Sequence, residues 1–326
     1  MTDIHAVRVH ETGDADQLTY ETIELEPPAP DEIRLRHEAI GVNYIDTYHR
    51  GGLYPLEPPF TLGMEGAGVV EETGDAVDLF SPGDRVAYGT GPPGSYAEAR
   101  NIAADRVVAL PDDIDFEEAA AVMLKGMTVE YLVRRTFEVE AGMNVLWHAA
   151  AGGVGQIACQ WLDAIGATSF GTVSTERKAE MAVEAGCDHP IRYTEEEVPA
   201  RIEELTGGDG VAVVYDGVGA ETFEASLEVL KRRGMLVTFG NASGPPPAIE
   251  PLELNRRGSL FLTRPSLMDY VATRGELVGS TDALFERVLV GDIDVTIGQT
   301  WPLRRAAEAH RALENRETTG STVLKP

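Results

Sequence analysis

The fold is decided by one stretch of the sequence, Val145-Leu146-Trp147-His148-Ala149-Ala150-Ala151-Gly152-Gly153-Val154-Gly155. Its apolar start predicts a short strand, and small residues follow at once. Gly152 and Gly153 allow backbone N–H groups to approach a pyrophosphate, while Gly155 allows a following helix to pack closely on the strand. A strand, a glycine turn and a helix in this order are typical of a dinucleotide-binding site.

The residues after this turn predict a helix and then a repeated alternation of elements. The apolar positions recur with a helical period, at Val154, Ile157, Ala158, Trp161, Leu162 and Ile165. We then expect strands at 169–173, 211–215 and 235–239, and helices at 176–185, 198–205 and 221–230. Alternating strands and helices predict an α/β fold with a doubly wound parallel sheet of the Rossmann type.

The segments on either side differ from this block. Short alternating runs at 33–36, 66–70 and 85–88 predict a mainly β region. Helices are expected at 117–123, 127–135, 281–289 and 306–313, with a last strand at 321–324. Because 326 residues exceed the usual size of one core, we expect two domains. Residues 1–125 and 265–326 would form one domain, and residues 126–264 the dinucleotide-binding domain.

The charge of the chain is strongly acidic. There are 54 Asp and Glu residues against 27 Lys and Arg, a net charge of -27, and only four of the basic residues are lysines. The carboxylates are scattered from Asp3 to Glu317, so they predict a distributed acidic surface rather than one partner-binding patch. We interpret this surface as an adaptation to high salt, where self-repulsion is screened. It disfavours binding to nucleic acid, which needs clustered cations.

The number of cysteines and the hydropathy of the chain indicate where in the cell the protein is expected. Cys159 and Cys187 are the only cysteines, too few for a disulfide scaffold or a four-cysteine zinc site. The first ten residues are charged, and no apolar run approaches the length of a membrane span. We expect a cytoplasmic protein that neither crosses nor binds a membrane.

The end of the second Rossmann strand bears on the choice of dinucleotide. An NAD-binding site places an acidic residue there, whereas this strand ends Gly171-Thr172-Val173-Ser174-Thr175. Ser174, Arg177 and Lys178 supply a hydroxyl and two cations suited to a 2'-phosphate, which favours NADPH. Two alternatives stay open: Glu176 could bind a ribose diol, and the cations could be an ordinary solvated helix face.

Several ordered motifs together resemble one family over essentially the whole chain. They are Asn43 to Tyr48, Gly52-Leu53-Tyr54-Pro55, Leu124-Lys125-Gly126-Met127-Thr128, Ala149 to Trp161, Val214-Tyr215-Asp216, Phe239-Gly240-Asn241 and Thr263-Arg264-Pro265-Ser266-Leu267. The chain resembles the zinc-free, zeta-crystallin-like quinone oxidoreductases of the medium-chain dehydrogenase/reductase superfamily. The resemblance implies that the first domain is a mainly β GroES-like catalytic domain, and that the protein is a homodimer.

The resemblance also implies a set of cofactor-binding residues for NADPH. These are Thr128, Gly152, Gly153, Val154, Gly155, Ser174, Lys178, Tyr193, Gly217, Gly240, Asn241 and Arg316. Related enzymes often carry Ser where this chain has Gly217, which leaves the local hydrogen bonding open. Tyr193 follows the third expected strand, where an ordinary strand-end aromatic is the alternative.

The zinc-dependent members of the superfamily have ligands in two segments where this chain has none. Asn43 and Met64 stand at those positions, and neither is a credible catalytic zinc ligand. Without a Lewis acid, hydride transfer to an electrophilic acceptor such as a quinone is the expected chemistry. The resemblance implies that Asn43, Tyr48 and Tyr54 line the acceptor side, where they would hydrogen-bond a developing oxyanion; half-buried packing is the alternative for both tyrosines.

Two rival functions remain open from the sequence. The same metal-free site could reduce the double bond of an enone or alkenal with NADPH. The chain could also be a non-catalytic binding protein that is stabilised by its cofactor, as zeta-crystallin relatives suggest.

Overall fold

The computed structural model describes residues 1–326, and these divide into two compact units. Unit 1 comprises residues 1–127, 271–291 and 295–326, and unit 2 comprises residues 128–270 and 292–294. Each unit has its own sheets and its own apolar core.

Unit 2 is built on a six-stranded sheet in which every neighbouring pair is parallel. The spatial order is β11-β10-β9-β12-β13-β14, so the chain runs outward in one direction, returns to the centre and runs outward in the other. The strands are β9 (Asn144–Trp147), β10 (Thr168–Val173), β11 (His189–Arg192), β12 (Val211–Asp216), β13 (Leu230–Thr238) and β14 (Phe261–Thr263). This is the Rossmann order with its reversal between β9 and β12, and it confirms the predicted doubly wound sheet.

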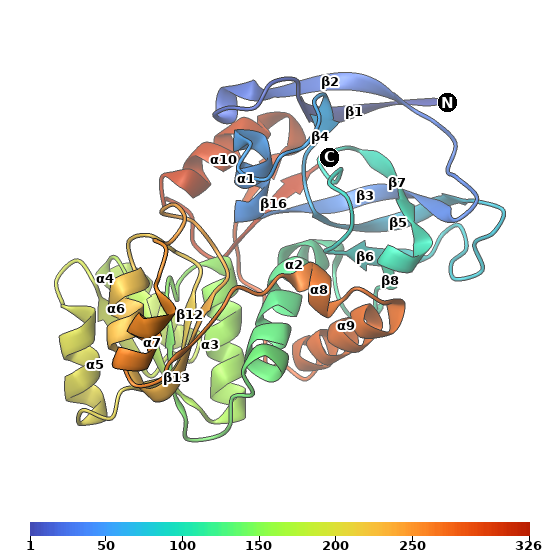
Figure 1. The fold of residues 1–326 in the computed structure, drawn as a ribbon. Helices are drawn as coiled ribbons and strands as arrows, with labels where there is room; N and C mark the ends of the chain where they lie inside the picture. Colours follow the sequence, from blue (N-terminus) through green and yellow to red (C-terminus); the bar gives the residue numbers. More distant parts are fainter. The chain divides into compact units, whose positions relative to one another are not determined.

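Six helices belong to the same unit as this sheet. They are α3 (Gly153–Ile165), α4 (Glu176–Glu184), α5 (Val198–Thr206), α6 (Phe223–Glu228), α7 (Pro251–Arg256) and α8 (Leu267–Tyr270). Helix α3 packs beside α4. Helix α5 packs beside α6, as Figure 1 shows. Two apolar clusters result. One joins small residues such as Ala150, Cys159 and Ala182, and the other contains larger ones such as Phe170 and Phe223.

Unit 1 contains two mainly antiparallel sheets. The smaller has the order β2-β1-β4, and the larger has the order β15-β16-β3-β5-β6-β8, with β7 also paired to β3. The strands are β1 (Thr2–Val9), β2 (Leu18–Leu25), β3 (Glu32–Val42), β4 (Phe60–Thr61), β5 (Glu65–Thr73), β6 (Arg85–Tyr88), β7 (Ala99–Ala103), β8 (Val108–Ala109), β15 (Ile297–Pro302) and β16 (Ser321–Lys325). Figure 1 shows the long β1–β2 hairpin and the β3–β5 pair. The predicted mainly β region is confirmed.

Four α-helices complete this part of the chain. They are α1 (Tyr44–Gly51), α2 (Phe116–Tyr131), α9 (Arg274–Leu289) and α10 (Ala306–Glu314). Three 3-10 turns, η1 (Ala15–Gln17), η2 (Ala104–Arg106) and η4 (Leu303–Arg305), and a π-helical turn, η3 (Leu132–Thr136), lie between elements. No helix combines the length and apolar character that a membrane crossing needs.

Several predicted bounds are wrong. One helix, α2, replaces the two expected at 117–123 and 127–135, because Lys125 and Gly126 do not interrupt it. Lys125 is buried against a carboxylate. A Cβ at Gly126 would lie 2.4 Å from Leu284 Cδ1, so the glycine lets α9 pack closely on the helix.

Other errors are shifts of element ends. Strand β13 begins at Leu230, five residues before the expected start, because Leu230 already pairs with Val211 of β12. The register then shifts, with Arg233 in a left-handed conformation, before pairing resumes at Met235. Helix α6 spans Phe223–Glu228 instead of the expected 221–230, and Leu230 belongs to β13. Helix α9 begins at Arg274, where Thr273 and Glu276 form a capping box.

Candidate active site

The glycine turn lies between β9 and α3, at the reversal of the strand order in unit 2. Gly152 is the N-cap residue of α3, and Gly152, Gly153 and Val154 are half-buried. Gly155 is buried, and a Cβ there would lie 2.3 Å from the Ala149 oxygen and 2.6 Å from the Ala150 oxygen. Gly155 is therefore packed closely against the backbone of the turn. The N-terminal N–H groups of α3 are arranged as a pyrophosphate requires. These residues fit a dinucleotide.

Three further cofactor candidates lie at the carboxyl ends of β10 and β11. Ser174 follows β10, Lys178 lies in the first turn of α4, and Tyr193 follows β11. The two strand ends are tied together, since Tyr193 N–H donates to the Val173 oxygen (3.1 Å) and Thr194 Oγ1 donates to the Ser174 oxygen (3.0 Å). The structure thus brings Ser174 and Tyr193 to one edge of the sheet. Tyr193 is 43% exposed.

Glu176, the possible ribose ligand, is engaged elsewhere. Its Oε2 lies 2.8 Å from a guanidinium nitrogen of Arg192, which also pairs with Glu195. This ion pair holds the Glu176 carboxylate against β11. Sequence reasoning missed Arg192, which adds a cation at the same sheet edge as Lys178.

The turns after β12 and β13 carry Gly217, Gly240 and Asn241, and the two turns touch. A Cβ at Gly240 would lie 2.2 Å from the Gly217 oxygen. A Cβ at Gly217 would lie 3.0 Å from the ring of Phe239, so the aromatic ring occupies the space that a serine side chain would need. Arg264, which was not predicted as a candidate, donates to the Gly240 oxygen at 2.9 Å and so lies beside the second of these turns.

The last two cofactor candidates lie apart in the chain. Thr128 is buried within α2, at the first residue of unit 2. Arg316 belongs to unit 1, where it follows α10 in a left-handed conformation with φ of 61°. The predicted set therefore draws residues from both units.

The three acceptor-side candidates lie on one helix and the turn that follows it, all in unit 1. Asn43 is the N-cap residue of α1, Tyr48 lies within the helix, and Tyr54 follows its end. The rings of Tyr48 and Tyr54 meet edge to face with centroids 5.4 Å apart. The backbone N–H of Tyr54 donates to the backbone carbonyl oxygen of Tyr48. The start of α1, the helix itself and the turn after it thus carry the three residues, and the two tyrosine rings are in contact.

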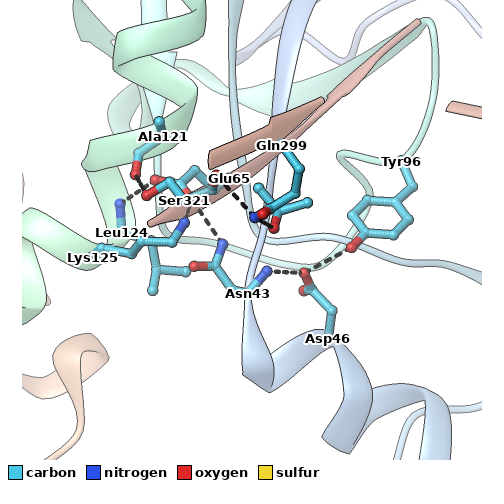
Figure 2. Close-up of polar contacts among 10 residues, drawn as sticks. Asn43, Asp46, Glu65, Tyr96, Ala121, Leu124, Lys125, Gln299 and Ser321 are labelled. Carbon is cyan, nitrogen blue, oxygen red and sulfur yellow. Dashed lines mark hydrogen bonds and ion pairs between the residues drawn. The ribbon is translucent and has the colours of Figure 1, made fainter. Parts of the chain in front are cut away.

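The Asn43 amide is held by a buried carboxylate that sequence reasoning did not single out. Asn43 Nδ2 donates to Glu65 Oε2 at 2.8 Å, and Lys125 Nζ lies 3.1 Å from the same oxygen. Leu124 N–H donates to the other oxygen, Oε1, at 2.7 Å. Figure 2 shows Asn43, Lys125 and Leu124 converging on Glu65.

A second buried carboxylate fixes the start of α1. Asp46 Oδ2 accepts from Asn43 N–H at 2.8 Å and from the Tyr96 hydroxyl at 3.1 Å (Figure 2). Burial raises the pKa of Asp46 to about 7, although these hydrogen bonds and the charge of Lys125 act to lower it. The N-cap residue is therefore bound to a group that titrates near neutral pH.

This contact continues to the C-terminal helix. Tyr96 Oη lies 3.0 Å from His310 Nε2, and His310 Nδ1 lies 3.1 Å from a nitrogen of Arg50. Because a guanidinium only donates, Nδ1 must accept, Nε2 must donate to Tyr96, and Tyr96 must donate to Asp46. Burial lowers the pKa of His310 to about 3, so this neutral tautomer persists at neutral pH.

A third buried polar network lies below the glycine turn. Asp216 accepts from Val218 N–H, Gly219 N–H and the hydroxyls of Thr222 and Ser226, at 2.8 to 3.0 Å. His148, which opens the turn after β9, contacts Ser226 Oγ at 2.9 Å and Thr172 Oγ1 at 3.0 Å. The network ties together the carboxyl ends of β9, β10 and β12.

No group of three or more His, Cys, Asp or Glu side chains in the chain is arranged to hold a metal ion. Met64, at one position where zinc dehydrogenases carry a ligand, is buried.

Comparison with known proteins decides the family. The family described as "Alcohol dehydrogenase GroES-like domain" matches residues 29–112, and "Zinc-binding dehydrogenase" matches residues 153–284. A quinone oxidoreductase of Pseudomonas aeruginosa is 50% identical over 96% of this chain and 97% of its own length. The chain belongs to the quinone oxidoreductase family.

Two further proteins are similar to the chain over 99% of its length. The structure of Escherichia coli quinone oxidoreductase complexed with NADPH superposes with a TM-score of 0.97 at 46% identity, and covers 99% of this chain and 100% of that one. A 2-haloacrylate reductase of Burkholderia is 44% identical over 99% of both chains. The predicted fold and family are confirmed.

Proposed function

We propose that this quinone oxidoreductase family member transfers hydride from NADPH to a quinone and uses no metal ion. The observation that carries the proposal is the packed glycine turn at the switch point of a Rossmann sheet, with Lys178 in the first turn of the following α4. Relatives named quinone oxidoreductase, one of them crystallised with NADPH, support it.

In this reaction the protein has two tasks: to bind NADPH and to hydrogen-bond the quinone. NADPH supplies the hydride when bound, and a proton completes the reduction of the quinone to the hydroquinone. Asn43, Tyr48 and Tyr54 would donate hydrogen bonds to the quinone oxygen on which negative charge develops. The α3 N-terminus and Lys178 would bind the phosphates and hold the dinucleotide in place.

Replacing Lys178 by alanine is expected to weaken use of NADPH selectively. The loss of one charge-assisted contact to a 2'-phosphate should reduce kcat/KM for NADPH by about ten- to a hundredfold. Values for NADH should change less than about twofold, since NADH lacks that phosphate. Steady-state kinetics with one quinone measure both values. Lys231→Ala, which removes an exposed lysine of unit 2, serves as the control. Equal losses for both dinucleotides would refute the assignment of Lys178.

A second function is favoured by one comparison. The 2-haloacrylate reductase relative reduces, by its name, a conjugated double bond, and so supports an NADPH-dependent enone or alkenal reductase as the alternative. The values of kcat/KM for a quinone and an enone separate the two functions, because their ratio measures relative transition-state binding.

We further propose a homodimer formed through the edge of the Rossmann sheet. Strand β14 pairs only with β13, so its other edge has no strand partner, and Phe261 in it is 53% exposed. An uncovered apolar edge favours pairing with another strand, here the same strand of a second copy. Light scattering that gave the mass of one chain would overturn the dimer.

The acidic surface supports a further proposal, that the protein works in the cytoplasm of a high-salt cell and does not bind nucleic acid. With a net charge of -27, the folded protein should repel itself in dilute buffer. We expect the melting temperature to rise by several degrees between about 0.1 M and 2 M KCl, because the screening length falls to a few ångströms. A melting temperature that does not respond to KCl would contradict this adaptation.

A further inference from the structure

Glu65 is a fully buried carboxylate, and its surroundings account for both oxygens. It is 0% exposed at the start of β5, where an ionised group needs compensating partners. Leu124 N–H occupies Oε1, and Asn43 Nδ2 and Lys125 Nζ share Oε2. The proposed acceptor-side amide and a buried ion pair therefore meet at one atom.

The cation of this pair is one of only four lysines in a chain that otherwise uses arginine. Lys125 is 5% exposed, and Glu65 is the one carboxylate that pairs with it. An arginine would approach the carboxylate through both oxygens with its planar fork. Oε1 is already held by Leu124, so a compact ammonium leaves Oε2 accessible to Asn43, whereas a guanidinium would compete with it.

The local backbone is also shaped for this contact. Gly41 lies two residues before Asn43 on β3 and pairs with Glu65 across the sheet. A Cβ at Gly41 would lie 2.2 Å from Glu65 Oε2 and 2.1 Å from the Ala120 oxygen. The absence of a side chain there lets the carboxylate reach from β5 to Asn43 and α2.

The carboxylate orients the Asn43 amide together with the capping box of α1, in which the Asn43 side chain accepts from Asp46 N–H. A carboxylate accepts hydrogen bonds only, so Nδ2 must face Glu65, and a flipped amide would set two oxygens against each other. One N–H of Nδ2 is then used, and the second N–H keeps a fixed direction.

We propose that Glu65 and Lys125 are positioning residues for the acceptor: Glu65 locks the Asn43 amide so that its second N–H meets the reacting oxygen, and Lys125 holds the Glu65 carboxylate in place through Oε2. The inference rests on the proposed function, because it gives Asn43 its role on the acceptor side. If the proposal holds, loss of the ion pair lowers the rate of quinone reduction and leaves the binding of NADPH unchanged.

The test compares charge removal with and without Asn43. The variant Glu65→Gln/Lys125→Met removes both charges, so no buried charge is left unpaired, but a Gln amide no longer dictates the orientation of Asn43. We expect its kcat with a quinone to fall about tenfold while the Kd for NADPH and the melting temperature stay near those of the unmodified protein. In an Asn43→Ala background the same double change should reduce kcat less than twofold further, because the residue through which it acts is gone.

A second variant covers the case in which the double variant does not fold. Lys125→Arg keeps the positive charge, and competition with Asn43 for Oε2 should lower kcat several-fold. The control Arg34→Met/Glu72→Gln removes another ion pair between β3 and β5 and should leave kcat within twofold.

The outcomes are distinct. If the unmodified protein reduces quinones and the charge-free variant and Lys125→Arg both match its kcat, the pair is only structural and the inference is overturned. The same holds if the loss of kcat is equally large in the Asn43→Ala background. If the unmodified protein binds NADPH but reduces no quinone, the proposed function fails, and the inference fails with it.

Discussion

Replacing Gly155 by valine is expected to abolish NADPH binding, with a rise in Kd of at least about a hundredfold. Even the first carbon of a side chain would lie 2.3 Å from the Ala149 oxygen and 2.6 Å from the Ala150 oxygen, and both contacts are with backbone. Backbone cannot rotate away as a side chain can, so α3 must shift or the turn must open. Either movement displaces the N–H groups that would face the pyrophosphate.

Fluorescence titration with NADPH and a thermal melt measure this effect. The control is Gly275→Ala at the start of α9, where no atom lies within 4 Å of the added carbon. It should leave both values unchanged within error. A Gly155→Val variant that bound NADPH with nearly normal affinity would show that the turn does not hold the cofactor.

Replacing Asp216 by alanine is expected to give the largest loss of stability. The carboxylate is 0% exposed and accepts from two backbone N–H groups and two hydroxyls. Its removal leaves these donors buried without their acceptor, which should lower the free energy of unfolding of unit 2 by about 3 to 5 kcal/mol. The turn from Gly217 to Gly219 should loosen at the same time.

Urea unfolding followed by circular dichroism measures the loss. Asp209→Ala, an exposed aspartate in the same unit, is the matched control and should change the free energy of unfolding by less than about 0.5 kcal/mol. A loss below about 1 kcal/mol for Asp216→Ala would mean that water replaces the carboxylate and that the network is not structural.

The sequence predicts the Rossmann sheet well because the signals are local. Short apolar runs give the strands, and the glycine turn gives the connection to α3. The element ends were less predictable, since tertiary contacts decide them. Gly126 lies within α2 where Leu284 packs on it, and β13 begins early because Leu230 pairs with Val211.

Some residues of the candidate site could be predicted from local motifs, and others could not. Its glycines, tyrosines and Lys178 stand in recognisable motifs. Glu65 and Lys125 are sixty residues apart in the sequence, and nothing in their spacing shows that they meet. Lys125 stands in the motif Leu124 to Thr128 and is one of only four lysines, but neither observation points to Glu65 as its partner.

The network from Asp46 through Tyr96 to His310 was not predictable either. Its members lie on α1, beside β7 and on α10. Only the fold brings them together, and no regular spacing in the sequence marks them.

The most direct test of the account is the rate of quinone-dependent NADPH oxidation after treatment with a strong chelator. We expect rapid oxidation that is unchanged by the chelator, because in the proposed site Asn43, Tyr48 and Tyr54 would stabilise the developing charge by hydrogen bonds alone. Activity that disappears with the chelator and returns with zinc would contradict it.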